Sequence, residues 1–96
     1  MLLGRVVGQV VATVRSPGFD NVSLLLVQDT TGNEPDGEGA ICVAVDLIGA
    51  GSGDVVLMTT GSAARVAAGA DTPTDRAVVA IADSVIRHEA ALHRTA

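Results

Sequence analysis

The chain has 96 residues, 48 % of them hydrophobic, and its six basic and eleven acidic side chains give a formal net charge of −5. A chain this short forms one domain and buries only roughly 60–65 % of the surface that its unfolded form exposes, so we expect some of its apolar surface to be hidden in an oligomer. The negative charge, and Phe19 as the only aromatic side chain, argue against partners such as nucleic acid or an anionic membrane.

The titratable residues indicate neither a cofactor nor a metal. Cys42 is the only cysteine and lies within a strand pattern, so we interpret it as a small core residue in a reducing cytoplasm. On a helix, His88 and His93 would point about 140° apart and could not share a metal ion. No charge-free apolar run approaches the roughly 18 residues of a membrane span, so we expect a soluble protein.

The first predicted element is a long strand over Leu2–Val14, because apolar and small residues occupy its even positions. Two of these are Gly4 and Gly8, which allow the bend that a strand needs in a small closed barrel. A turn follows at Ser16–Gly18.

The next part of the chain predicts two strands around a polar loop. Ser23–Gln28 is a short apolar run of strand length, and Asp29–Gly39 has the composition of an exposed loop. Ala40–Asp46 alternates larger and smaller apolar residues, which predicts a strand buried on both faces.

Between Val45 and Val56, an apolar strand leads into a loop with three alternating glycines, and a second strand follows. Glycines at alternate positions are typical of close backbone contacts. The loop consists of Gly49, Ala50, Gly51, Ser52 and Gly53.

This loop begins like a dinucleotide-binding fingerprint, but Asp54 replaces the third glycine and a strand pattern follows instead of a helix. A small-molecule or nucleotide-binding barrel using this loop is therefore the alternative function. Asp46 and Asp54 flank the loop with no nucleophile or histidine nearby in the sequence. We predict that they accept hydrogen bonds from loop amides and do not form an acid–base pair.

Beyond the loop, the pattern predicts a strand at Asp54–Thr60 and a short helix from Gly61 to about Ala68, with Ser62 as a candidate N-cap. Ala77–Ala82 predicts a fifth strand, with a continuous helix from Asp75 to His93 as the competing interpretation.

The end of the chain predicts an amphipathic helix, which would pack on its own barrel, on a neighbour or on cargo. Together the elements predict a mainly β fold, namely a five-stranded barrel of oligonucleotide-binding (OB-like) topology with a short interposed helix and a C-terminal helix. We expect a single domain over residues 1–96, with the barrel in 1–83 and the C-terminal helix in 84–96.

The sequence resembles the vertex proteins of bacterial microcompartment shells, the EutN/CcmL family, over nearly its whole length. Five segments carry the resemblance in the same order: Gly4–Gly8 with Ala12–Thr13, Leu24–Val27, Val45–Val56, Gly61–Arg65, and Thr74–Asp75 before Val78–Asp83.

The resemblance implies a non-enzymatic structural protein that forms homopentamers at the five-fold vertices of a microcompartment shell in the cytoplasm. It implies hexameric or pseudohexameric shell proteins as partners, with encapsulated enzymes as further candidates. Carried onto this chain, it puts the Gly49–Gly53 loop near the five-fold axis or a subunit contact. Arg65 and Asp46 become candidates for contacts between subunits, although an ordinary surface role suits Arg65 equally well.

Overall fold

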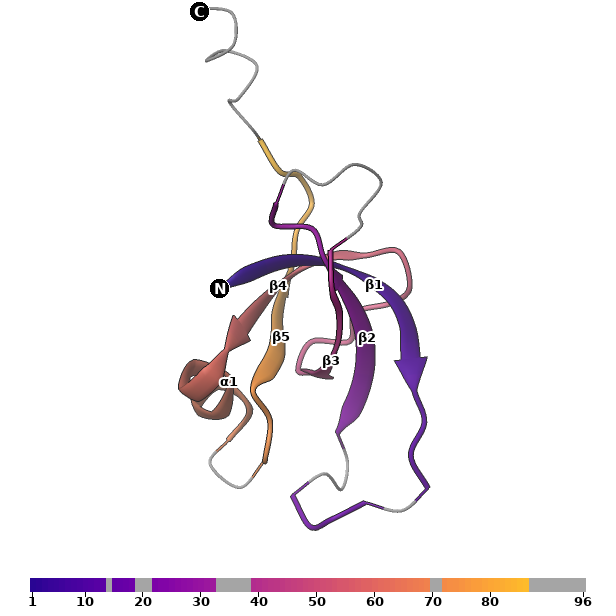
Figure 1. The fold of residues 1–96 in the computed structure, drawn as a ribbon, viewed down its shortest axis with the longest axis vertical. Helices are drawn as coiled ribbons and strands as arrows, with labels where there is room; N and C mark the ends of the chain where they lie inside the picture. Colours follow the sequence, from indigo (N-terminus) through magenta and orange to yellow (C-terminus); the bar gives the residue numbers. More distant parts are fainter. Residues whose placement is uncertain (14, 19–21, 33–38, 70–71, 87–96) are drawn as a thin grey trace, which may run out of the picture.

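The computed structural model describes residues 1–13, 15–18, 22–32, 39–69 and 72–86. Within them the chain forms five strands and one short helix (Figure 1): β1 (Leu2–Val10), β2 (Ser23–Asp29), β3 (Ile41–Asp46), β4 (Val55–Thr60), α1 (Gly61–Ala68) and β5 (Arg76–Ile81). The strands close into a barrel in the order β1-β2-β3-β5-β4, and only the β3–β5 pair is parallel. The predicted mainly β, five-stranded barrel is confirmed.

The barrel interior is filled by the inward-facing residues of the strands. Its largest fully buried side chains are Met58, Val6, Val27, Val56 and Val78. Val45 is also fully buried, but it lies on the opposite face of β3 from the inward-facing Ala44. Burying each contributes about 1.5–3 kcal/mol relative to leaving it exposed. β-branched valines suit this position because their restricted χ1 costs little on a pleated sheet.

β1 is bent, as we predicted from Gly4 and Gly8 in its sequence. Its pairing register with β2 shifts between Val6 and Gly8, which leaves Val7 as an extra residue in the ladder, the mark of a β-bulge. A Cβ atom at Gly4 would lie 2.5 Å from Val27 Cγ1, so glycine is needed where β1 crosses the core. The strand ends at Val10 and not at Val14, because the ladder with β2 ends there.

The barrel is held together least where β3 meets β5. The parallel ladder there contains only the pairs Val45–Ala77 and Asp46–Val78, and Leu47 N donates to Val78 O at 3.3 Å. Among the described residues, the first half of β3 therefore pairs with β2 alone.

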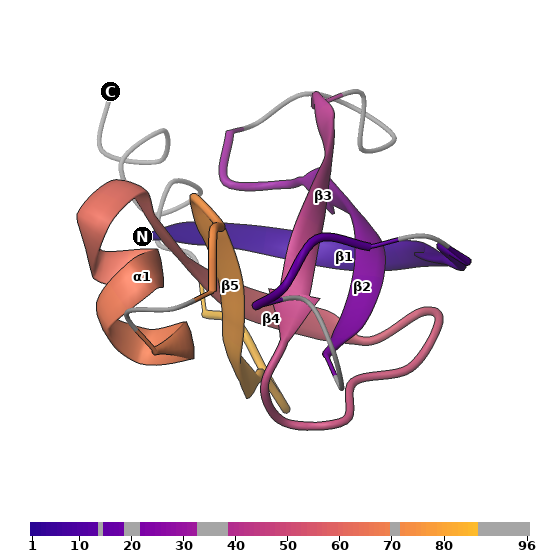
Figure 2. The same ribbon diagram turned by 90° about the horizontal axis from the view of Figure 1, so that it is seen from below.

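α1 lies beside β4 and β5 and buries only Ala64 (Figures 1 and 2). The prediction of Ser62 as N-cap is wrong: Thr60 holds that position, without a side-chain hydrogen bond, and Ser62 is already inside the helix. The reason is tertiary, since Gly61 N donates to Asp75 O at 2.9 Å and the helix starts directly at the end of β4.

The fifth predicted strand is confirmed as β5, and the competing helix from Asp75 is wrong. The predicted C-terminal helix does not begin at residue 84, since Ser84–Ile86 have no regular structure. The rest of that segment, with His88 and His93, lies outside the described residues, as do residues 33–38 of the polar loop.

Candidate functional site: the glycine loop and the outer barrel face

The glycine loop between β3 and β4 is folded around the carboxylate of Asp46. Its Oδ1 accepts hydrogen bonds from Ile48 N and Gly49 N at 3.1 Å and from Ala50 N at 3.3 Å. Asp54 Oδ2 accepts one from Gly51 N at 2.8 Å. Both predicted aspartates therefore bind loop amides, as the sequence indicated.

The far side of the loop is attached to β1 through the backbone of Val6. Gly53 N donates to Val6 O at 2.8 Å, and Val6 N donates to Asp54 O at 2.9 Å. Gly49 and Gly53 have φ angles of 81° and 89°, which side-chain-bearing residues rarely adopt. Figure 2 shows the loop as the pink connection that runs from the end of β3 to β4.

Sequence reasoning missed the anchoring role of Val6. No side-chain pattern could have indicated it, because the bonds use only backbone groups.

The same hydrogen bonds argue against a phosphate site in the loop. The amides of Ile48, Gly49, Ala50 and Gly51 donate to carboxylates, and that of Gly53 donates to a carbonyl. A phosphate cradle needs free amides pointing at the anion, and two nearby carboxylates would repel it.

A half-open hollow of about 290 Å³ lies between the loop, β1 and β2. Its polar side chains are Gln9, Ser23, Asp46 and Ser52. Asp46 is the ionisable residue among the lining residues, so the hollow supplies no positive charge for a nucleotide.

The outer faces of β1, β2 and β3 form apolar rows across the strands. The register aligns Val10 with Leu24 and Val45, and Gly8 with Leu26 and Val43. Leu26 covers the glycine, since a Cβ atom at Gly8 would lie 3.4 Å from Leu26 Cδ1.

The prediction that both faces of Ala40–Asp46 are buried is wrong for the single chain. On the outer face Ile41 is 57 % exposed and Val43 46 %, whereas Ala44 on the inner face is fully buried. Exposed apolar side chains that adjoin one another in this way are typical of surfaces that contact another molecule.

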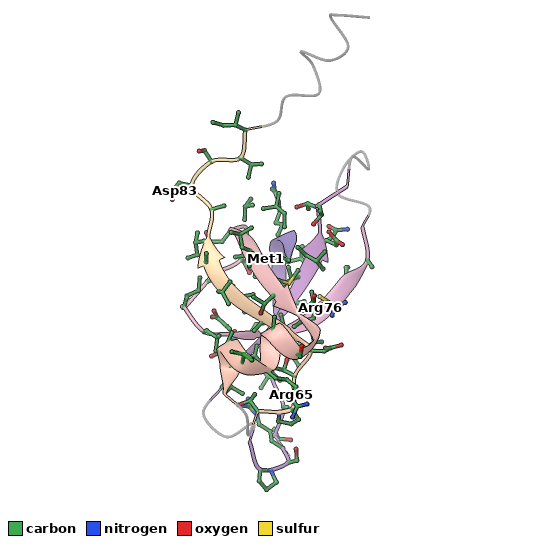
Figure 3. The ribbon with its side chains drawn as sticks, turned by 90° about the vertical axis from the view of Figure 1, so that its left-hand side faces the viewer. Met1, Arg65, Arg76 and Asp83 are labelled. Atoms are coloured by element: carbon green, nitrogen blue, oxygen red, sulfur yellow. The ribbon has the colours of Figure 1, made fainter. Side chains whose placement is uncertain are left out.

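Arg65 and Asp46 lie on separate parts of the barrel. Arg65 is exposed on α1 (Figure 3), and its backbone oxygen accepts a hydrogen bond from Gly69 N at 2.9 Å. Asp46 ends β3, where its Oδ1 is bonded to the loop. Within the described residues no hydrogen bond or ion pair joins them, so they do not form one intramolecular site.

Cys42 is half-buried and packs against the core, as predicted. Burial raises the pKa of its thiol above the ordinary value of 9.0, and the nearby Arg76 guanidinium partly offsets this. A thiol held in its neutral form is a poor nucleophile. The sequence did not indicate that Arg76 acts on Cys42, since only the fold brings Arg76 beside β3.

Among the described residues there is no helix with the length and apolarity needed to cross a membrane. The same part of the chain contains no group of three or more metal-ligating side chains.

The chain is a closed β-barrel of oligonucleotide-binding topology. Two carboxylates hold its glycine loop, and its outer face is apolar and partly exposed, which is typical of small β-barrel proteins that associate with other chains. The sequence model of the family described as "Ethanolamine utilisation protein EutN/carboxysome" matches residues 1–83. The chain is 47 % identical over 89 residues to the bacterial microcompartment shell vertex protein EutN of Escherichia coli (strain K12), covering 90 % of each protein.

The likeness extends to carboxysome proteins and to solved structures. The carboxysome shell vertex protein CcmL of Synechocystis sp. is 44 % identical over 88 residues, covering 88 % of this chain and 85 % of that protein. The GrpN pentameric microcompartment shell protein from Rhodospirillum rubrum has a TM-score of 0.78 at 36 % identity, covering 91 % of this chain and all of that one. The chain belongs to the EutN/CcmL family.

Proposed function

We propose that this chain is a structural shell protein that assembles as a homopentamer and caps the five-fold vertices of a bacterial microcompartment. The observation that carries the proposal is its 47 % identity, over 90 % of its length, to a protein named as a shell vertex protein. A solved structure 36 % identical to this chain is named as pentameric.

The surface of the barrel supports assembly on physical grounds. Ile41 and Val43 are about half exposed on adjacent outward positions of one strand. Exposed apolar groups of this kind favour association, and a closed ring buries them without leaving an open edge for further growth.

The glycine loop is proposed to lie near the ring axis or a subunit contact. Its tip is exposed, and a Cβ atom at Gly51 would meet only Asp54 Oδ2, at 3.8 Å. The fold of one chain therefore leaves room for a side chain at position 51. A glycine is needed there only if neighbouring copies crowd the loop. Arg65 and Asp46 remain candidates for contacts between subunits.

The proposed partners beyond the ring are hexameric or pseudohexameric shell proteins, whose flat sheets need pentagons to close, with encapsulated enzymes as further candidates. Catalysis is assigned to those enzymes. A nucleotide-binding role for the loop is not favoured, because its amides already bind its own aspartates and the backbone of β1.

Native mass spectrometry of the purified chain at low micromolar concentration tests the proposal. A dominant species of five 9.6 kDa chains is expected. A monomer, or a hexamer without pentamer, would contradict it. Co-expression with a hexameric shell protein tests the vertex role: closed polyhedral shells should form with the chain present, and only open sheets or shells with gaps at the vertices without it.

A further inference from the structure

Neighbouring copies in the proposed homopentamer, on which the pairing below rests, meet around a five-fold axis. A ring with five-fold symmetry contains no two-fold contact, so its interface is heterologous. Each subunit must therefore present two different and complementary patches, one to each neighbour.

The first apolar group, the β3 patch, consists of Ile41 and Val43. They are 57 % and 46 % exposed and point outward from the same face of β3. Their part of β3 pairs only with β2, since the ladder with β5 is confined to Val45 and Asp46.

The second group, the exit patch, consists of Ile81, Val85 and Ile86. Their exposed fractions are 43 %, 47 % and 78 %. The segment leaves the barrel directly after Ala82, whose N–H donates to Val55 O at 2.7 Å. Beyond that bond the described residues up to Ile86 have no regular structure and lie exposed.

The two patches lie on different sides of the barrel. One row of neighbours leads from Ile41 through Gln28, Arg5 and Val55 to Ala82. These four strand-to-strand steps of about 4.8 Å correspond to about 19 Å along the barrel surface. The direct route across the β3–β5 ladder is no shorter, because Ile41 precedes Val45 by four residues and Ile81 follows Ala77, the partner of Val45, by four, which together span about 26 Å along the strands. The first half of β3 and the yellow segment after β5 are well separated in Figure 2, and in Figure 3 the segment with Asp83 lies on the opposite side from β2 and β3.

Six further large apolar side chains among the described residues are exposed and lie outside the two patches. They are Met1, Val7, Val11, Leu47, Ile48 and Val66. Leu47 and Ile48 adjoin the glycine loop, which has its own proposed place in the ring. Val66, at 83 %, is a single exposed valine on a helix face of small and charged residues.

We propose that the exit patch of one copy packs against the β3 patch of the next copy, head to tail around the ring. Each patch alone leaves apolar surface in water, and their separation on one barrel prevents them from covering each other within a chain. Repeated five times, the contact buries both patches of every copy.

A charge-swap experiment tests the pairing. Val43→Lys and Ile86→Asp each put an unpaired charge into the proposed contact, so each should raise the concentration for half-assembly roughly 100-fold or more. The double variant places a lysine opposite an aspartate at every junction and should regain most of the pentamer. Val66→Lys and Val66→Asp are matched controls that should assemble normally.

Native mass spectrometry measures assembly, and circular dichroism verifies the barrel. Ile41→Lys replaces Val43→Lys if the latter fails to fold. A wild-type chain that is not a pentamer overturns the proposed function itself. A pentameric wild type overturns only the pairing if either single variant assembles at the wild-type concentration, or if the double variant is no better than the single variants.

Discussion

The carboxylate of Asp46 offers the sharpest test of how the glycine loop is held. In Asp46→Ala, the amides of Ile48, Gly49 and Ala50 lose their common acceptor. The first two residues are exposed, so water replaces the carboxylate at their amides. Ala50 is only 9 % exposed, and its amide is left without a partner.

An unsatisfied buried amide costs about 1–3 kcal/mol, so we expect Asp46→Ala to lose about 2 kcal/mol of unfolding free energy. For a domain of this size that loss corresponds to a drop of roughly 8–16 °C in Tm. Asp46→Asn keeps an acceptor oxygen and should lose less than about 1 kcal/mol. Asp54→Ala frees only the exposed amide of Gly51 and should lose about 0.5–1 kcal/mol.

The assay is urea unfolding of all four proteins at one fixed concentration, because assembly contributes to apparent stability. Hydrogen exchange at residues 48–50 reports on the loop directly, and all three amides should exchange faster in Asp46→Ala when the proteins are compared in the same oligomeric state. The Asp46 carboxylate does not hold the loop in this way if Asp46→Ala loses no more unfolding free energy than Asp54→Ala, or if Asp46→Asn loses as much as Asp46→Ala.

Gly51→Leu should leave the barrel intact by circular dichroism, since a Cβ atom there meets one side-chain oxygen at 3.8 Å. The same variant should abolish the pentamer in native mass spectrometry. An unchanged pentamer that still enters shells would exclude crowding at this loop. Gly4→Ala should lower the unfolding free energy by about 1–3 kcal/mol, because its Cβ would lie 2.5 Å from Val27 Cγ1. If the variant is as stable in urea as the wild type, β1 can shift to make room for the methyl group. At Cys42 the folded chain holds the thiol proton more tightly than the unfolded chain, so stability should fall as pH rises beyond the ordinary pKa of 9.0. Iodoacetamide at pH 8 should label Cys42 more slowly in the folded chain than in urea, and equal rates would contradict the shielding.

The strand pattern was largely readable from the sequence. Alternation of apolar side chains reflects which face of a strand is covered, and the residues that show it are neighbours along the chain. β2, β3, β4 and β5 accordingly begin and end within one residue of their predicted bounds.

The capping role of Asp46 and Asp54 was also predictable, because an aspartate beside a glycine loop reaches amides only a few residues away.

The features that the sequence did not reveal depend on residues far apart in the chain. Ser62 failed as an N-cap because Asp75 O, beyond the helix, accepts from Gly61 N. β1 ends at Val10 because its pairing with β2 ends there. The glycine loop is bonded to the backbone of Val6, which lies more than forty residues earlier in the chain.

The number and kind of strands, the bend at the two glycines and the polarity of the loop are readable from the sequence, because these follow from local periodicity and local hydrogen bonding. The folded chain was needed to see that the strands close through a two-pair ladder between β3 and β5, and that Ile41 and Val43 stay exposed while Val45 is buried. The physical reason is that closure and exposure depend on which distant segments meet, and side-chain periodicity within one segment carries no information about its partner.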